Sequence, residues 1–166
     1  MPRRRSPAEL DLLMRQLGTD LDLEFRGTAG YFEDADLATA RSGGRAPRRA
    51  DIGVVSALDS AEQLLANRLK TQQGELAPLG HPDYGSRHHE LIGEPNTETN
   101  RNLVKLHVLA CLRQEPRLEE ILRVAVRPAA TREERQTVTI DAEVVARGDP
   151  TPLSLVVPFS FAGPLT

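Results

Sequence analysis

Apolar and polar residues alternate in three runs in the C-terminal part of the chain. The apolar positions are Leu122, Val124 and Val126, then Val138, Ile140, Ala142 and Val144, then Leu153, Leu155 and Val157. A period of two residues is typical of a β-strand with one buried face. Gly148-Asp149-Pro150 marks the last turn, and the short links favour an antiparallel meander with one solvated face.

Two segments before these runs have a helical period instead. In the first, one face carries Leu58, Ala61, Leu64, Leu65 and Leu69. Ser60 and Gln63 have the spacing of a capping box, and Gly74 is placed to close this helix with a left-handed residue. The second segment runs from about Thr97 to Gln114. It is apolar over most of its circumference, so we expect deep burial.

These elements predict an α+β fold, an antiparallel β-meander of three or more strands covered on one face by two main α-helices, with an N-terminal arm. The arm comprises residues 1–20. Its short helix starts at Ser6-Pro7, ends at Gly18, and must dock because it is too short to be stable alone.

Residues 21–166 are expected to form a single α+β domain. At its start, Leu21, Leu23 and Phe25 alternate with charged residues as in a half-buried strand. Residues 39–50 are rich in Arg, Gly and Ala and predict a loop, either solvated or in contact with an acidic partner.

Composition narrows the function classes. A net charge of -3 provides no basic field to attract nucleic acid or an anionic membrane. Cys111 is the only cysteine, which excludes an internal disulfide. No apolar run is long enough to span a bilayer, so we expect a cytoplasmic protein without direct membrane insertion.

Three groups of residues invite a catalytic or metal-binding interpretation. His81, His88 and His89 lack the ligand spacing of a metal site, and turn capping or packing on Tyr84 is the expected role. Glu75, Asp83 and Glu90 offer carboxylates for a glycosidase pair, but the chain has no Trp to line a sugar cleft. Cys111 lies four residues after His107, and burial is the expected state of this thiol. We therefore expect no enzyme activity, no metal and no cofactor.

Glu115-Pro116-Arg117 joins the second helix to the first strand of the meander. Pro116 makes the junction stiff, so the flanking charges are expected to point in fixed directions. A guanidinium can form a bidentate salt bridge, so Arg117 is expected to bind either a partner protein or Glu119 of its own chain. The alternative is a simple helix stop with solvated charges.

Four motifs in order resemble a known family. They are Asn67-Arg68-Leu69-Lys70-Thr71, Gly74-Glu75-Leu76, His81-Pro82-Asp83-Tyr84-Gly85 and Glu115-Pro116-Arg117. Over about residues 51–145 the chain is similar to the baseplate-wedge family of contractile phage tails, historically called "lysozyme-like". That family includes sheath initiators of type VI secretion baseplates and of extracellular contractile injection systems.

The resemblance implies a structural baseplate subunit that joins wedge proteins and templates sheath polymerisation by strand addition. The implied partners are wedge subunits, the first-ring sheath subunit, and hub or tube proteins, in six copies within a phage-tail-like particle. The alternative is a peptidoglycan hydrolase of lysozyme type in a tail baseplate.

By residue match, the resemblance also assigns roles to two groups of positions, and the implied strand addition needs a sheet edge in the predicted meander. Partner binding falls on Glu115, Pro116 and Arg117. A structural loop is formed by Gly74, Glu75, Pro82, Tyr84 and Gly85. A free sheet edge accepts a strand by exposing unpaired backbone groups, and the expected sheath-contacting edge comprises Val138, Ile140, Leu153, Leu155 and Val157.

Overall fold

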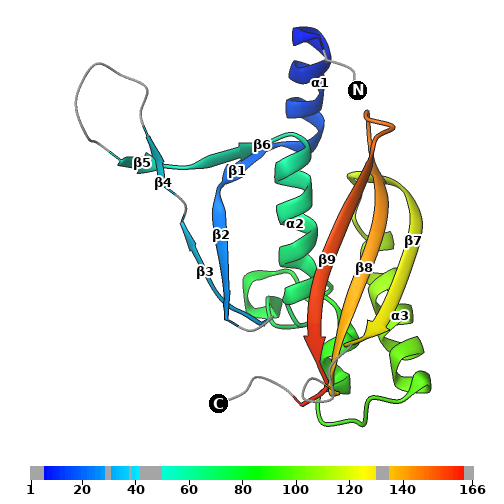
Figure 1. Ribbon diagram of the computed structural model, residues 1–166. Helices are drawn as coiled ribbons and strands as arrows, with labels where there is room; N and C mark the ends of the chain where they lie inside the picture. Colours follow the sequence, from blue (N-terminus) through cyan, green and yellow to red (C-terminus); the bar gives the residue numbers. More distant parts are fainter. Residues whose placement is uncertain (1–5, 29–30, 38, 42–49, 130–134, 163–166) are drawn as a thin grey trace.

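The computed structural model describes residues 6–28, 31–37, 39–41, 50–129 and 135–162 (Figure 1). The elements in chain order are α1 (Pro7–Leu17), β1 (Thr19–Leu21), β2 (Leu23–Thr28), β3 (Tyr31–Leu37), β4 (Thr39–Arg41), β5 (Ala50–Ile52), β6 (Val54–Ser56), α2 (Leu58–Lys70), the 3₁₀ helices η1 (Ala77–Leu79) and η2 (Arg87–Leu91), α3 (Glu98–Arg113), β7 (Leu118–Pro128), β8 (Thr137–Ala146) and β9 (Pro152–Ser160). The predicted α+β class is confirmed.

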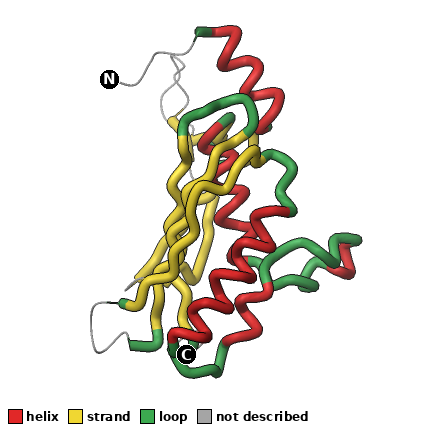
Figure 2. Tube along the Cα trace, turned by 90° about the vertical axis from the view of Figure 1, so that its right-hand side faces the viewer, coloured by secondary structure: helices red, strands yellow, loops and turns green. Residues whose placement is uncertain are grey.

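The predicted meander is an antiparallel sheet in the order β7-β8-β9. Every second side chain of β8 is buried, as its alternating sequence predicts. Figure 2 shows the strands in one layer and the two long helices α2 and α3 in another. The core between these layers joins Leu65 and Leu69 of α2 and Val104 and Val108 of α3 to the inner face of the sheet.

One strand departs from its predicted alternation. β7 pairs with β8 with register irregularities between Leu118 and Glu120 and between Ile121 and Arg123. A bulge moves the next side chain to the opposite face, because strand side chains have a period of two. Leu122 was predicted to face the core but is 45% exposed, whereas Ile121 packs against the core.

α3 begins where the sequence predicts. Thr97 is its N-cap, and its side chain accepts a hydrogen bond from the amide of Asn100. The prediction of burial over most of its circumference is wrong. Leu106 is 60% exposed, and the buried positions follow one stripe that faces the sheet.

The predicted cap of α2 is also wrong. The helix starts at Leu58 after Ala57, and no side chain caps it. Gln63 instead binds the end of β1 and the start of β2, because its side chain accepts from the Leu23 amide and donates to the Leu21 carbonyl, both at 2.8 Å. The helix ends at Lys70 with Thr71 as its C-cap, so Gly74 lies in the following turn rather than at the C-cap.

The arm helix docks on the domain. Ser6 and Glu9 form a capping box at the start of α1, and Gly18 ends the helix by donating its amide to the Met14 carbonyl. Leu13 and Leu17 are buried in a small cluster with Ala61 of α2 and Ala146 at the end of β8. This contact supplies the burial that so short a helix needs.

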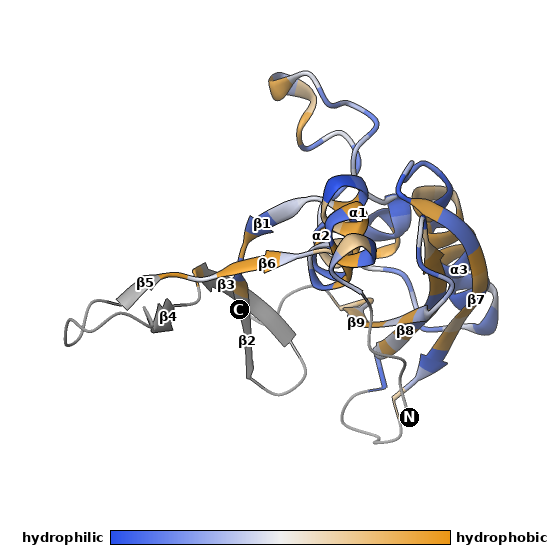
Figure 3. Ribbon diagram, turned by 90° about the horizontal axis from the view of Figure 1, so that it is seen from above, coloured by the Kyte–Doolittle hydropathy of each residue, from blue (hydrophilic) through white to orange (hydrophobic). Residues whose placement is uncertain are grey.

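The segment between α1 and α2 folds as antiparallel pairs β1–β6, β2–β3 and β4–β5. Alternation predicted only the strand around residues 21–26. Figure 1 shows the β4–β5 pair away from the helices and the main sheet, and Figure 3 shows the chain from β5 to β6 approaching α2 from that side. β3 comes near β9 but is not hydrogen-bonded to it. Most of the predicted loop, residues 42–49, lies outside the described residues.

Within the described ranges, every helix is too short or too polar to cross a bilayer.

Candidate functional site

The edges of the β7-β8-β9 sheet are β7 and β9. β8 is paired on both sides, so Val138 and Ile140 cannot belong to an edge as predicted. Both side chains are fully buried between the sheet and the helices. Their alternation revealed an inner face but not the position of the strand within the sheet.

The direction of the β9 amides follows from one hydrogen bond and the register. The Phe161 amide donates to the Gln136 carbonyl at 2.9 Å, and the pairing of β8 with β9 has no shift. Because antiparallel pairs alternate, residues 153, 155, 157 and 159 turn their amides toward β8. Ser154 and Val156 therefore turn theirs outward, away from the sheet.

This direction corrects the rest of the predicted edge. Leu155 and Val157 lie on β9, but their side chains are buried against the helices and, like Leu153, they bond to β8. The groups that a partner strand would meet belong instead to Ser154 and Val156, and the Val156 side chain is 55% exposed on the outer face.

Prolines occupy the two outward positions that flank Ser154 and Val156. Pro152 and Pro158 have the same parity as Val156, so each lacks an amide where β9 faces away from β8. Proline is tolerated in a strand at such outward positions of an edge. The open donors of β9 between them are consequently confined to residues 153–157.

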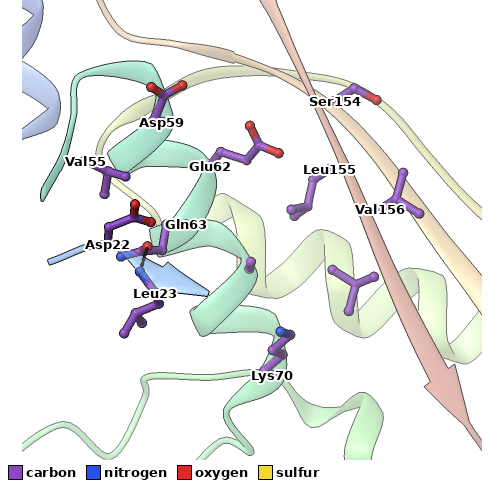
Figure 4. A pocket seen from close by; sticks show the side chains of 12 residues that line it. Asp22, Leu23, Val55, Asp59, Glu62, Gln63, Lys70, Ser154, Leu155 and Val156 are labelled. Atoms are coloured by element: carbon purple, nitrogen blue, oxygen red, sulfur yellow. Dashed lines mark hydrogen bonds between the residues drawn. The ribbon is translucent and has the colours of Figure 1, made fainter. Parts of the chain in front are cut away.

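A groove of about 380 Å³ runs beside this stretch, between β9 and α2. Its lining residues are Asp22, Leu23, Val55, Asp59, Glu62, Gln63, Ala66, Lys70, Ser154, Leu155, Val156 and Val157. Figure 4 shows Asp59 and Glu62 on the α2 wall across from Ser154, with Lys70 at the other end. Burial lowers the pKa of Lys70 to about 8. The lining therefore joins apolar side chains to an acidic end, next to unpaired backbone donors.

The opposite edge has a different character. β7 carries the two irregularities described above, and Glu119, Glu120 and Arg123 are exposed along it. Arg127 forms an ion pair with Asp141 of β8 at 2.9 Å. Bulges and charges are devices that keep an edge from pairing with another chain.

Of the predicted partner-binding residues Glu115, Pro116 and Arg117, the structure buries Glu115 and leaves the Arg117 side chain half-exposed. Glu115 is only 7% exposed and points into the protein, where Arg68 of α2 lies 3.5 Å from its Oε2. Its Oε1 accepts a hydrogen bond from the Arg117 amide at 3.1 Å. Glu115 thus holds the junction together from inside, and Pro116 is also part of this turn.

The Arg117 side chain stays half-exposed. Its Nε lies 4.0 Å from Glu115 Oε1, so the structure places Arg117 beside Glu115 rather than in the predicted pair with Glu119. Because the backbone and guanidinium of Arg117 both approach one buried carboxylate, its remaining donors have a defined direction. The predicted partner contact remains a prediction for this side chain.

Arg68 is a functional candidate that periodicity analysis missed. It is buried at 8% exposure, donates from Nη2 to Gln114 Oε1 at 3.1 Å, and stacks over the Tyr84 ring at 4.9 Å. Within the described residues its Nε has no partner. A charge between Leu65 and Leu69, on the apolar side of the predicted helix, was the available signal.

The loop after α2 is folded by close backbone contacts. Gly85 has φ +100°, and a Cβ there would lie 2.6 Å from the Thr71 carbonyl oxygen, so only glycine fits. Gly74 also has positive φ, and Glu75 Oε2 accepts from the Gln72 amide at 3.2 Å. Pro82 and Tyr84 line a hollow of about 550 Å³ that reaches Arg68.

Capping, one of the two predicted roles of the histidines, is found at His89, whose Nε2 lies 2.9 Å from the Leu69 carbonyl oxygen at the end of α2. The other predicted role, packing on Tyr84, is not the one that His88 and His89 adopt. His88 and His89 lie edge-on to Phe159 at the end of β9, with ring centroids 4.8 and 6.2 Å away. His88 Nδ1 is 2.8 Å from Ser86 Oγ, and burial lowers its pKa to about 3. No cluster of three or more His, Cys, Asp or Glu able to hold a metal occurs among the described residues.

The remaining candidate groups are held in structural contacts. Arg87 binds both oxygens of Glu90, at 2.9 and 3.0 Å, which lowers the pKa of that carboxyl. Cys111 is buried, and desolvation raises the pKa of its thiol. A protonated thiol at neutral pH is a poor nucleophile.

Comparison with known proteins found a similar solved structure and a matching protein family. The chain is similar to a protein from Geobacter sulfurreducens whose crystal structure is described as that of a candidate tail lysozyme, with 25% identity and a TM-score of 0.53. The match covers 64% of this chain and 93% of the other. No significant match was found among curated proteins. The family described as "Baseplate wedge protein gp25" matches residues 55–149, the range from β6 to the turn after β8, and the chain therefore belongs to that family.

Proposed function

We propose that this protein is a structural subunit of a contractile injection system that joins inner baseplate and wedge proteins and templates sheath polymerisation through β9. Family membership supplies the coarser statement, a baseplate component of a phage-tail-like particle that assembles with other components. The finer statement rests on one observation: β9 is a regular, unpaired edge with outward donors at Ser154 and Val156 beside a groove. A strand from the first sheath ring would extend the sheet there.

Wedge contacts are assigned to a different surface of the same domain. Arg117 is half-exposed and oriented by buried Glu115, so it presents a guanidinium suited to a carboxylate of a wedge or hub subunit. We place six copies around the tail axis, as the family implies. The particle would be assembled in the cytoplasm.

The test of strand addition is a pair of proline substitutions on the two edges. The Ala129 amide donates to the Thr137 carbonyl, so by alternation Val126 turns its amide away from β8 just as Val156 does. Val156→Pro and Val126→Pro therefore each remove one outward donor without breaking the sheet. Thermal unfolding should confirm that both variants fold.

Binding is measured with the sheath subunit of the same particle, by interferometry and by counting sheaths in electron micrographs. We expect Val156→Pro to weaken binding by at least about tenfold, because it removes a central donor and obstructs the incoming strand. Val126→Pro should bind like the unchanged protein. Equal binding by both variants, or no binding by the unchanged protein, would overturn strand addition at β9.

A second candidate function, peptidoglycan hydrolysis, is raised by the description of the Geobacter protein as a candidate tail lysozyme. We propose that this chain is not an enzyme. A general acid needs a carboxyl with a raised pKa. The pKa of Glu90 is lowered, and Glu75 bonds to the Gln72 amide within a turn. Purified protein should leave peptidoglycan suspensions turbid, and clearing that disappears in Glu75→Gln would contradict this.

A further inference from the structure

The groove between β9 and α2 has a lining that specifies the chemistry of its occupant. On the sheet side it offers the outward donors of Ser154 and Val156. A strand added to β9 would alternate, with every second side chain directed into the groove and the others beside Val156 on the outer face. Those entering the groove would meet Leu23, Val55 and Ala66. Apolar side chains fit these positions.

One end of the groove is acidic. Asp59 and Glu62 lie one turn apart on α2 and are exposed, and Asp22 lies close to them between β1 and β2 (Figure 4). In the part of the chain that the structure describes, none of the three forms an ion pair. Lys70 is at the opposite end, beyond Ala66. A cation on the incoming strand would be favoured at the acidic end and an anion disfavoured.

The length of the occupant is limited as well. Pro152 and Pro158 flank the open donors, so only residues 153–157 can pair regularly with another strand. A second copy of this chain fits poorly, because the sequence of β9, Pro-Leu-Ser-Leu-Val-Val-Pro-Phe-Ser, has no cation to place beside Asp59 and Glu62. β7 of a second copy does carry Arg123 and Arg127, but its two register irregularities interrupt regular pairing. A segment of a different protein is therefore the occupant that fits the groove best.

We infer that the strand received by β9 is a short, alternating apolar segment carrying Lys or Arg at the end that lies beside Asp22, Asp59 and Glu62. This inference rests on the proposed strand addition and adds the partner's charge and length to it. Charge pairing across the groove selects the correct strand among many with similar apolar character.

Two synthetic peptides probe the inference on the full-length protein. Both share a short core of alternating Val and Thr; one has Lys at each end and the other Glu, so neither strand direction is favoured. Binding is followed by chemical-shift changes at the Ser154 and Val156 amides. We expect the Lys peptide to bind about tenfold more tightly, from two or three partly exposed charge pairs.

Charge reversal on α2 supplies the decisive variant. Glu62→Lys should reduce or invert the preference for the Lys peptide, while Glu120→Lys on the β7 edge should leave it unchanged. Equal affinity for both peptides at β9, lost in Val156→Pro, would overturn the charge inference and leave strand addition intact. Strand addition itself would be rejected only if Val156→Pro and Val126→Pro bound the sheath subunit equally well, or if the unchanged protein did not bind it. Concentration-dependent dimers that block β9, measured by sedimentation, would show that a second copy is the occupant and overturn the inference.

Discussion

The two edges of the main sheet differ in almost every property that governs strand pairing. β7 is interrupted by two register irregularities and carries exposed charges, whereas β9 keeps an unbroken register with β8. β9 also borders a groove, and its exposed donors lie between two prolines. One edge is protected and the other is left open over a short stretch. This asymmetry supports the proposal that β9 is a docking surface rather than an incidental border.

The supports of the two edges differ as well. β7 starts directly after the buried Arg68–Glu115 pair, which fixes its root to α2. The far end of β9 is held by aromatic packing, with Phe159 against His88 and Phe161. Ionic anchoring and aromatic anchoring respond differently to mutation and to pH, which makes the comparison experimentally accessible.

The largest effect on stability is expected at the junction before β7, where Glu115 pairs with Arg68. Glu115→Ala leaves Arg68 buried without its carboxylate, and removing one member of a buried pair costs about 3–5 kcal/mol. Chemical denaturation should show this loss, and hydrogen exchange should show β7 opening before β9. Glu119→Ala, four residues later on β7 and exposed, is the matched control. A stability change below about 1 kcal/mol for Glu115→Ala would mean that the pair does not anchor this edge.

Gly85→Ala is expected to act on the β9 side. Its Cβ would lie 2.6 Å from the Thr71 carbonyl oxygen at a φ of +100°, so the loop that carries His88 must shift. We expect a loss of about 2–4 kcal/mol, combining backbone strain with the displaced contact. Gly80→Ala is the control, since it shares positive φ but meets nothing within 4 Å. Equal losses for both would show that strain alone, not the close approach, is responsible.

Acidification should weaken the β9 end selectively. Desolvation, helped by His89 and His107, lowers the pKa of His88 to about 3, whereas a histidine in the unfolded chain titrates near its model value of 6.5. Below that value the unfolded state binds a proton that the folded state does not, so stability falls as pH decreases. From pH 7 to pH 5 the loss from His88 is about 1–2 kcal/mol.

The measurement is denaturation at both pH values for the unchanged protein and for His88→Phe. The variant should be less stable at pH 7, because Ser86 loses a partner, yet its stability should depend less on pH. If the stability of the two proteins fell equally from pH 7 to pH 5, His88 would not be the cause of the acid sensitivity.

The smallest stability effect is expected at Arg117. Its side chain is 39% exposed and 4.0 Å from Glu115, so Arg117→Glu should change stability by less than about 1 kcal/mol. Assembly with wedge subunits, followed by native gel electrophoresis, should nevertheless be blocked. The new carboxylate at position 117 would repel the wedge-subunit carboxylate that Arg117 is proposed to bind. A variant that unfolds, or one that assembles normally, would contradict the proposed contact.

Local patterns predicted the elements that local physics controls. The alternation at Val138, Ile140, Ala142 and Val144 gave the buried face of β8, and Thr97 marked the start of α3. Those features depend on residues within a few positions of one another. The capping pattern at Ser60 and Gln63 failed because Gln63 is used in a tertiary contact with Leu21 and Leu23.

The site itself depends on distant residues, so periodicity could not assemble it. The groove joins Asp22, Glu62 and Ser154, and the junction joins Arg68 to Glu115. The predicted meander already placed the strand of Val138 between two neighbours, so its assignment to an edge was inconsistent with that meander and is wrong. The family resemblance identified the correct class of protein, but the direction of Glu115 and the outward donors of β9 came from the three-dimensional structure.

The prolines at positions 152 and 158 have a consequence for the free subunit before assembly. An extended fibre grows when strand after strand stacks along a continuous row of backbone donors. On β9 the row of backbone donors is interrupted by Pro152 and Pro158. A short partner strand would still fit between them, whereas continuous stacking of free subunits is disfavoured. The two prolines that would limit the length of the proposed partner strand would also disfavour aggregation of the unassembled protein.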